Sequence, residues 1–199
     1  MNKKQETIDS YNNHASAYAD RFNNVRTRAL AIEETFSYIK KSNPKVLEIG
    51  CANGRDAKII IRYTNGYLGI DISEKLIEIA RKNVPEAKFE VADIESYDFP
   101  ENIDVILAFS SLIHSDMKNL RKILDESYRS MARGGVMYLS MKYGDYHEET
   151  IESEIGSRTY YFYTFDDIKK MIGGKFTILK EEIEHQQNQD WIEMIIRKI

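Results

Sequence analysis

The sequence contains few cysteines, few prolines and no long apolar segment, and each of these shortages excludes a class of protein. The single cysteine, Cys51, excludes an intramolecular disulfide framework and is typical of a reducing compartment, so we expect a cytoplasmic protein. Only 3 prolines and 10 glycines among 199 residues exclude a collagen-like or low-complexity chain. No apolar run approaches the roughly 20 residues that cross a bilayer. The polar start from Met1 to Ser10 does not have the pattern of a signal peptide, so we expect no membrane partner.

The chain also lacks an excess of positive charge. It has 28 basic and 32 acidic residues, which gives a net charge of −4. Proteins that bind nucleic acid broadly present a basic surface, so this balance argues against nucleic acid as a partner. The apolar content of 42% and the aromatic content of 11% are sufficient for a folded core. We therefore expect one domain over residues 1–199, with no linker and no internal repeat.

The prolines mark the starts of predicted strands. Pro44, Pro85 and Pro100 each precede a short, mostly apolar run, and proline is tolerated before a strand but not in its middle. The predicted strands of this region are 45–49, 67–70, 88–91, 103–109 and 136–141. Between them, apolar residues at three- and four-residue spacing predict helices at 55–62, 73–83 and 118–132, the second capped by Ser73. Alternating helices and strands that are apolar throughout predict an α/β fold with a parallel sheet covered on both faces.

The two ends of the chain depart from this alternation. Residues 5–41 read as two helices without a strand, and we expect residues 1–42 to form a helical cap. Residues 144–163 are polar and then aromatic with no clear period, so we expect an insertion that forms a lid. A further helix begins at the cap Thr164 and ends at Gly173. The runs 175–183 and 191–198 then predict a strand hairpin.

A glycine-containing loop indicates a nucleotide-like ligand. Gly50 and Gly54 follow the strand 45–49 at a strand-to-helix turn, where glycine lets the backbone approach a ligand closely. Asp71 ends the next strand, 21 positions after Gly50, where an acidic residue can accept both hydroxyls of a ribose. The sequence therefore predicts a nucleoside-containing cofactor at the point where a doubly wound sheet reverses its strand order.

The same loop discriminates between cofactors. A dinucleotide site requires G-x-G-x-x-G, but Ala52 and Asn53 interrupt that pattern. Glu48 just before the loop would repel a pyrophosphate, whereas it suits a ligand with an ammonium group and a sulfonium. This electrostatic argument favours S-adenosylmethionine over NAD and argues against a dehydrogenase.

Five motifs in the same order resemble those of the class I S-adenosylmethionine-dependent methyltransferases. They are Glu48–Gly54, Gly69–Ser73, Ala92–Ile94, Ile103–His114 and Met131–Gly135. The resemblance implies a Rossmann-like, doubly wound sheet of seven strands in the order 3-2-1-4-5-7-6, with strand 7 antiparallel. It also implies that the cofactor is S-adenosylmethionine.

The resemblance further implies the residues of the cofactor site, with Asp71 on the ribose, Asp93 near the adenine amino group and Ile94 packed on the ring. The full set of expected cofactor residues is Glu48, Gly50, Cys51, Gly54, Asp71, Ile72, Asp93, Ile94 and Phe109. Cys51 would be a small filler of the loop and not a nucleophile. Tyr11-x-x-x-Ala15-x-x-Tyr18 resembles the cap helix of small-molecule members, and we expect Tyr11 and Tyr18 to share one face and meet the cofactor's methionine end.

The acceptor site is predicted less closely. His114 follows the fourth strand, and it is either a general base or a wall of the pocket. The aromatic run that follows Arg158 either packs under the sheet edge or covers the acceptor, with Arg158 pairing an acidic substrate group. Candidate substrate residues are Lys142, Arg158, Tyr161 and Tyr163. Trp191 reads as a core residue, and the four scattered histidines predict no metal site.

These features predict a methyltransferase that acts on a small molecule at oxygen or nitrogen. One alternative is an RNA or protein acceptor, for which the N-terminal basic residues Lys3, Lys4, Arg21, Arg26 and Arg28 would form the binding patch. Another alternative is a regulator that binds the cofactor without catalysis.

Overall fold

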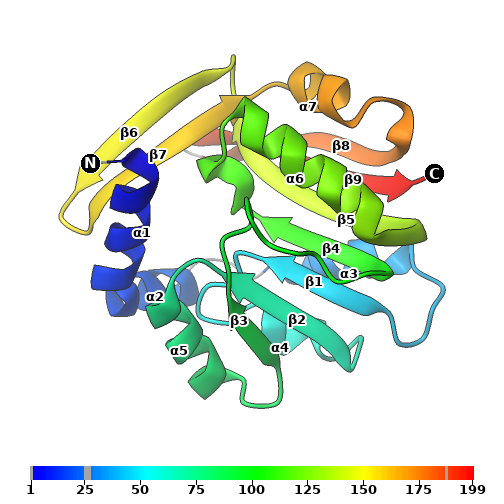
Figure 1. The fold of residues 1–199 in the computed structure, drawn as a ribbon, viewed down its shortest axis with the longest axis horizontal. Coiled ribbons are helices and arrows are strands. Elements are labelled where there is room, and N and C mark those ends of the chain that lie inside the picture. The colour runs from blue at the N-terminus through cyan, green and yellow to red at the C-terminus, as the bar shows by residue number, and fades with distance from the viewer. Residues whose placement is uncertain (1, 25–27, 187) are drawn as a thin grey trace.

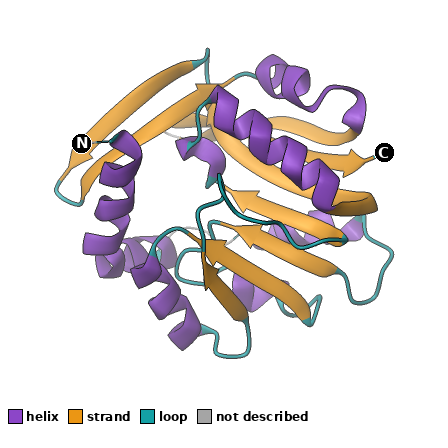
Figure 2. Ribbon diagram, in the orientation of Figure 1, coloured by secondary structure: helices purple, strands orange, loops and turns teal. Residues whose placement is uncertain are grey.

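The computed structural model describes residues 2–24, 28–186 and 188–199, and in it helices cover both faces of a nine-stranded sheet (Figures 1 and 2). The strands are β1 Lys45–Ile49, β2 Gly66–Asp71, β3 Lys88–Val91, β4 Ile103–Phe109, β5 Met131–Tyr143, β6 His147–Ser153, β7 Gly156–Tyr163, β8 Phe176–Gln186 and β9 Gln189–Lys198. The α-helices are α1 Lys3–Asn13, α2 Ala15–Asn23, α3 Ala29–Ser37, α4 Ala57–Ile60, α5 Glu74–Asn83, α6 Met117–Ser130 and α7 Phe165–Ile172. The 3₁₀ turns are η1 Leu112–His114 and η2 Gly173–Lys175.

The centre of the sheet has the expected order. Strands β3, β2, β1, β4 and β5 lie side by side and parallel. Strand β9 pairs antiparallel with β5 along residues 136–142, and β8 pairs antiparallel with β9. The last two strands therefore occupy the positions that the resemblance gives to strands 7 and 6. The predicted doubly wound α/β fold is confirmed, but the predicted count of seven strands is too low.

The two additional strands come from residues 144–163, for which the sequence indicated no regular structure. Strands β6 and β7 form an antiparallel hairpin, and β7 joins the end of β5 through Lys142 and Phe162 (Figure 1, yellow strands). Most of β6 is exposed, so it lacks the alternation of apolar and polar residues that marks a half-buried strand. The hairpin lies beside the carboxyl end of β5. The sequence did not predict it because β6 lacks that alternation.

The N-terminal helices differ from the two that were expected. The cap consists of α1, α2 and α3, and the backbone of His14 leaves the helical conformation between the first two (φ −120°). Helix α1 is held on the hairpin, since the Thr159 amide donates to Thr7 Oγ1 at 3.1 Å and Ser10 Oγ donates to the Ile155 carbonyl. Cap and hairpin therefore form one roof on the same side of the sheet (Figure 1).

Helix boundaries follow local capping where the sequence carries it. The Ser73 side chain caps α5 by accepting from the Leu76 amide, and Thr164 and Asp167 form a reciprocal capping box at α7. Gly173 ends α7 with φ +52°. Helix α6 ends at Ser130, two residues before the expected end, because Met131 already pairs with β4.

The core lies on both faces of the sheet. Leu47 and Ile106 belong to a buried cluster with α6 and α7, and Val46 and Val105 belong to one with α3, α4 and α5. Neighbouring residues of one strand are thus buried on opposite faces, as expected for a doubly covered parallel sheet. Each fully buried aliphatic side chain contributes about 1.5–3 kcal/mol, so the sheet gives the loops at its carboxyl edge a rigid base. Within the described residues, no helix is long and apolar enough to cross a membrane.

Candidate active site

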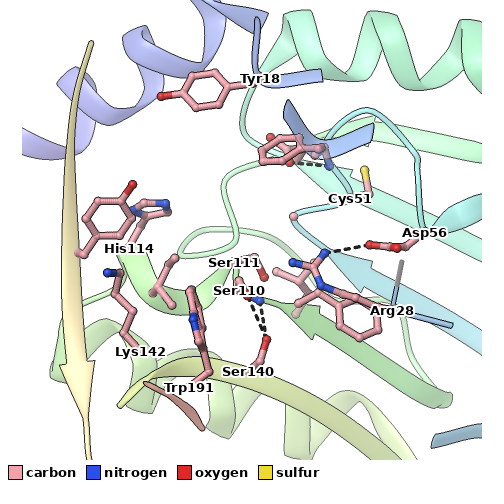
Figure 3. Close-up of a pocket in the computed structure, with 18 of the residues that line it drawn as sticks. Tyr18, Arg28, Cys51, Asp56, Ser110, Ser111, His114, Ser140, Lys142 and Trp191 are labelled. Carbon is pink, nitrogen blue, oxygen red and sulfur yellow. Dashed lines mark hydrogen bonds and ion pairs between the residues drawn. The ribbon is translucent and has the colours of Figure 1, made fainter. Parts of the chain in front are cut away.

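A cavity of about 1550 Å³ lies at the carboxyl ends of the parallel strands, beneath the roof formed by α1, α2 and the hairpin (Figure 3). Its floor includes the residues at or just after the ends of β1, β2 and β4, namely Ile49, Gly50, Asp71, Ile72, Phe109 and Ser110. Open α/β sheets bind ligands at this edge, where the strand order reverses. The fold therefore brings the predicted glycine loop and the predicted acidic residue into one cavity.

The glycine loop has a conformation that few other residues adopt. Gly50 and Gly54 have φ of +73° and +75°, and the amides of Gly50 and Cys51 both donate to the Ile70 carbonyl. A Cβ on Gly50 would lie 2.3 Å from Ser111 Cβ, so the space allows only glycine. Gly54 packs against Phe89 and is not a lining residue of the cavity. Gly54 thus shapes the loop from behind and is not placed for ligand contact, contrary to the prediction.

Asp71 lies in the cavity, and backbone amides hold its carboxylate in place. Oδ2 accepts from the Ala52 amide and Oδ1 from the Ser73 amide, both at 2.9 Å. Burial raises the pKa of Asp71 and these amides counteract the rise. Each oxygen keeps a further lone pair for a ligand hydroxyl. The carboxylate is therefore oriented before any ligand binds.

Asp93 and Ile94 lie across the same cavity after β3. Lys4 of α1 donates to Asp93 Oδ2 and to Glu95 Oε2, each at 2.6 Å. An ion pair thus joins the first helix of the cap to the loop that the resemblance assigns to the adenine. The sequence had placed Lys4 in a surface patch, so this contact was not predicted.

Glu48, which the resemblance places at the cofactor, is not among the residues that line the cavity. Its side chain is buried, and its carboxyl group accepts a hydrogen bond from Tyr67. Burial and the nearby Asp56 raise the pKa of Glu48 to about 8, and Arg28 and Arg55 oppose the rise. Adjacent residues of a strand face opposite sides, so the motif position alone did not determine where this carboxylate would lie.

The raised pKa of Glu48 predicts a pH dependence of stability. The unfolded chain releases this proton near pH 4.5, while the folded protein keeps it until about pH 8. The free energy of unfolding therefore falls as the pH rises through this range. Glu48→Gln keeps an acceptor for Tyr67 and removes the titration, so we expect urea unfolding of the variant to lack this decline. Glu86→Gln on the surface is the matched control, and an unchanged decline in Glu48→Gln would contradict the assignment.

Cys51 and Phe109 both line the cavity, as predicted. Burial raises the pKa of the Cys51 thiol well above its ordinary value, which keeps it protonated and suits a small packing group more than a nucleophile. Phe109 packs on Tyr138 with ring centroids 4.8 Å apart, and the Arg28 guanidinium lies 5.1 Å above the Phe109 ring.

The N-terminal basic residues do not form a free surface patch. Lys3 pairs with Glu148, and Arg28 pairs with Asp56 at 2.9 Å inside the cavity. Lys4 is paired as described above, and Arg21 lines the cavity. Arg26 lies outside the described residues. Most of the positive charge invoked for a macromolecular acceptor is therefore neutralised within the chain.

Tyr11 and Tyr18 meet in the cavity although the helix between them is broken. Their ring centroids are 4.6 Å apart, and both side chains line the cavity. Tyr18 is fully buried and its hydroxyl donates to the Ile155 carbonyl at 3.2 Å. The expected single helix is wrong, but the two rings share one surface as expected.

His114 also lines the cavity, and its two ring nitrogens are both engaged. Nδ1 lies 2.6 Å from the Thr159 carbonyl, which can only accept, so Nδ1 carries the proton. Nε2 therefore accepts from the Tyr11 hydroxyl at 3.0 Å. Burial and the cations Arg158 and Lys142 together lower the pKa of His114 to about 4, against the hydrogen bond with Thr159. This neutral imidazole, with both nitrogens hydrogen-bonded, is better suited to line the pocket and orient Tyr11 than to act as a general base.

The lowered pKa of His114 predicts the opposite pH dependence. The unfolded chain binds a proton below about pH 6.5, while the folded protein stays neutral at His114 until about pH 4. Stability therefore falls as the pH drops through this range, by at most about 3 kcal/mol. We expect His114→Gln to lack this component of the loss in urea unfolding between pH 7.5 and 5. The exposed His185→Gln should retain it, and equal slopes in both variants would contradict the prediction.

At the hairpin end of the cavity the strand alternation selects which predicted residues face inward. Lys142 and Arg158 line the cavity, together with Tyr160. Tyr161 and Tyr163 do not, because the Tyr161 hydroxyl donates to Glu148 at 2.8 Å and the Tyr163 hydroxyl to the Ser115 carbonyl at 2.6 Å. The prediction of these two tyrosines as substrate residues is therefore not supported by their position.

Sequence reasoning also missed residues that do face the cavity. Trp191 on β9 packs against the core, as expected, and also lines the cavity. Ser140 accepts from the Ser110 amide at 2.9 Å. Ser110 has φ +51°, a strained value for a residue other than glycine, directly after β4. The position of Ser110 after an apolar strand was visible in the sequence, but its backbone strain was not. In the described part of the chain, no three acidic, histidine or cysteine residues gather as a metal site.

Residues 46–135, which contain the glycine loop, Asp71, Asp93 and His114, match a family model described as a methyltransferase domain. The match supports the resemblance of this segment to the class I S-adenosylmethionine-dependent methyltransferases. The matched segment runs from β1 into β5, so it includes the glycine loop and Asp71 at the floor of the cavity.

Curated relatives have similar sequences over part of their length. The chain is 29% identical over 139 residues to dTDP-4-amino-2,3,4,6-tetradeoxy-D-glucose N,N-dimethyltransferase from Saccharopolyspora spinosa, and the match covers 66% of this chain and 55% of that protein. It is 30% identical over 127 residues to trans-aconitate 2-methyltransferase from Delftia acidovorans, with coverage of 61% and 46%. The chain thus spans about half the length of the curated relatives it matches.

Solved structures show the same fold with low sequence identity. Magnesium protoporphyrin IX methyltransferase from Synechocystis PCC 6803, solved with bound S-adenosylmethionine, matches with a TM-score of 0.76 and 14% identity over 100% of this chain and 98% of that chain. A Burkholderia thailandensis 1,6-didemethyltoxoflavin-N1-methyltransferase matches with a TM-score of 0.73 and 14% identity, with coverage of 96% and 86%. These similarities confirm the methyltransferase fold.

Proposed function

We propose that this protein transfers the methyl group of S-adenosylmethionine to an oxygen or nitrogen atom of a small molecule. The observation that carries the proposal is the roofed cavity at the carboxyl edge of β1, β2 and β4, which contains both the Gly50 loop and the Asp71 carboxylate. Methyl transfer from a sulfonium needs two reactants held in line and protected from water, more than it needs a strong base.

The residues of the cavity fit the cofactor. Asp71 is held by two backbone amides with lone pairs left for ribose hydroxyls. Ile72 and Ile94 offer apolar surface for the adenine, and Asp93 lies beside Ile94. The Ser111 hydroxyl is buried next to Gly50 without a hydrogen-bond partner among the described residues, as expected where a polar ligand completes the site.

When bound, S-adenosylmethionine supplies an electrophilic methyl group. A lone pair of the acceptor forms the new bond to the methyl carbon, the electron pair of the broken carbon–sulfur bond stays on sulfur, and the acceptor's proton passes to water. The chain contributes position and enclosure. Tyr11 and Tyr18 close the cavity from the cap, and His114 fixes the Tyr11 hydroxyl. His114 is a poor base at neutral pH because its pKa is about 4 and Tyr11 occupies its free nitrogen.

The roof supports a small-molecule acceptor. The contacts of Thr7 and Ser10 with β7 and the adjoining turn hold α1 across the cavity, which restricts access for a folded macromolecule. The pairing of Lys3 and Arg28 with acidic residues removes support for RNA binding. The relatives in Saccharopolyspora spinosa and Delftia acidovorans are named for an aminosugar nucleotide and for trans-aconitate, which also supports a small acceptor.

The experiment is incubation of the purified protein with methyl-labelled S-adenosylmethionine and a fractionated cell extract. We expect label in the small-molecule fraction and none in RNA or protein. Label in RNA or protein would replace the small-molecule proposal by the macromolecular one. Binding of S-adenosylhomocysteine without transfer to any fraction would instead favour a regulator that binds the cofactor without catalysis.

A further inference from the structure

Two cations at the hairpin end of the cavity have no acidic partner. Lys142 and Arg158 line this end, and neither has a carboxylate within 4.0 Å among the described residues. Other cations of the same lining form ion pairs: Lys4 with Asp93 and Glu95, Arg28 and Arg55 with Asp56, and Lys180 with Glu34 and Glu182. Arg21, which also lines the cavity, is exposed to solvent. Lys142 and Arg158 thus place positive charge that no ion pair neutralises at the partly buried end of the cavity, where Glu149 acts on Lys142 only from beyond ion-pair distance.

Aromatic rings hold both cations away from water. The Lys142 ammonium lies 4.8 Å from the ring centroids of Tyr160 and Phe162 and 5.9 Å from that of Trp191 (Figure 3). The Arg158 guanidinium lies 5.1 Å from the Tyr18 ring and 5.5 Å from the Tyr160 ring. Tyr160 therefore lies between the two cations. Burial and the nearby Arg158 lower the pKa of Lys142, and Glu149 opposes this fall.

Two hydrogen-bond donors in this region are also unused. Arg158 Nε and Trp191 Nε1 are buried and have no acceptor in the described part of the chain. Buried donors are nearly always paired in folded proteins, and an unpaired one costs about 1–3 kcal/mol. The ammonium of Lys142 has a single long contact, 3.3 Å to Gln189 Oε1. Two cationic donor groups and one neutral donor thus gather at one end of the cavity without an anion among the described residues.

We propose that Lys142 and Arg158 bind a carboxylate of the methyl acceptor, and that the rings of Tyr160 and Trp191 pack against an unsaturated or aromatic part of the same molecule. This inference rests on the proposed function and names the class of its substrate. A planar carboxylate matches the fork of a guanidinium, and a second cation adds charge without requiring a fixed direction. The two cations come from β5 and β7, on the far side of β4 from Asp71, so they are separate from the ribose end of the cofactor. Their task is to position the acceptor, and the methylated atom is another group of the molecule.

The test uses protein saturated with S-adenosylhomocysteine and three probe acids, benzoate, cinnamate and 4-hydroxyphenylacetate, each paired with its primary amide. We expect at least one acid to bind at least about tenfold more tightly than its amide, which corresponds to about 1.4 kcal/mol. Arg158→Gln and Lys142→Gln should each reduce this preference to near unity. Arg158→Lys should retain part of it, since it keeps the charge and loses the fork. Arg133→Gln, an exposed change, is the control.

The results separate this inference from the proposed function. If no acid binds more tightly than its amide, or if Arg158→Gln and Lys142→Gln leave the preference intact, the carboxylate site is wrong even though the cofactor binds. If Arg158→Gln weakens the binding of S-adenosylhomocysteine more than about threefold, the guanidinium binds the cofactor's own carboxylate, and this result also overturns the inference. Absence of S-adenosylhomocysteine binding in the wild type would instead contradict the proposed function.

Discussion

Replacing Gly50 by alanine is expected to lower the affinity for S-adenosylhomocysteine about 100-fold and to lower the melting temperature by about 10 °C. The new Cβ would lie 2.3 Å from Ser111 Cβ, and the backbone has φ +73°. Overpacking of this kind costs about 1–3 kcal/mol, and the left-handed backbone adds about 1 kcal/mol for alanine. Relief requires the loop or Ser111 to move, and both form the floor of the cavity beside Asp71.

Gly134→Ala is a matched control for this change. Gly134 has nearly the same backbone, φ +76°, but a Cβ there would meet nothing within 4 Å. The control therefore has the backbone strain without the steric clash. We expect a loss of about 1 kcal/mol, equal to about 2–4 °C in the melting temperature, and unchanged affinity for S-adenosylhomocysteine. Equal effects of the two substitutions on stability and binding would show that the contact with Ser111 has no role.

The second large effect is expected from Asp71→Asn, which should weaken S-adenosylhomocysteine about 100-fold as measured by calorimetric titration. The carboxylate accepts from the amides of Ala52 and Ser73 and offers its remaining lone pairs to the cavity. An asparagine amide has a donor group on one side, so one of the two backbone amides loses its acceptor. Hydrogen bonds to a charged group contribute about 1.5–3 kcal/mol each, so loss of the charge at two ribose hydroxyls is sufficient for this change.

Asp71→Asn also needs controls for folding and for charge. Asp98→Asn removes the same charge from an exposed position after β3 and should bind S-adenosylhomocysteine as the wild type does. Circular dichroism of the Asp71 variant should show the folded protein, because the other loop contacts, such as the Gly50 and Cys51 amides on the Ile70 carbonyl, remain. A folded Asp71→Asn protein with affinity within about threefold of the wild type would mean that the ribose lies elsewhere.

The fold was predictable where local signals and periodicity agreed. Ser73 and Thr164 cap their helices as their residue types predict, and the apolar runs after Pro44 and Pro100 are buried central strands. The hairpin of residues 147–163 was not predictable, because β6 is mostly exposed and shows no alternation. The break at His14 was also missed, since the helical spacing of Tyr11, Ala15 and Tyr18 continues across it.

The site was predictable as a set of positions and less so as a set of side-chain directions. Asp71, Ile72, Asp93 and Ile94 reach the cavity because each lies at or after the carboxyl end of a parallel strand. Glu48 belongs to the motif of the glycine loop, but its carboxyl group accepts from Tyr67. Successive side chains of a strand point to opposite faces of the sheet, so a shift of one residue changes which face a side chain reaches. The same alternation in β7 selects Arg158 and Tyr160 over Tyr161. These directions depend on register and bends that no motif encodes.

Hydrogen–deuterium exchange with and without S-adenosylhomocysteine tests most directly whether this cavity holds the cofactor. The ligand is expected to slow amide exchange in three segments that surround the cavity, residues 49–54, 70–73 and 92–95. The same experiment should leave helix α6, Met117–Ser130, unchanged, because none of its residues lines the cavity. The account is contradicted if the folded protein shows no protection in these three segments at saturating ligand, or shows protection only in other parts of the chain.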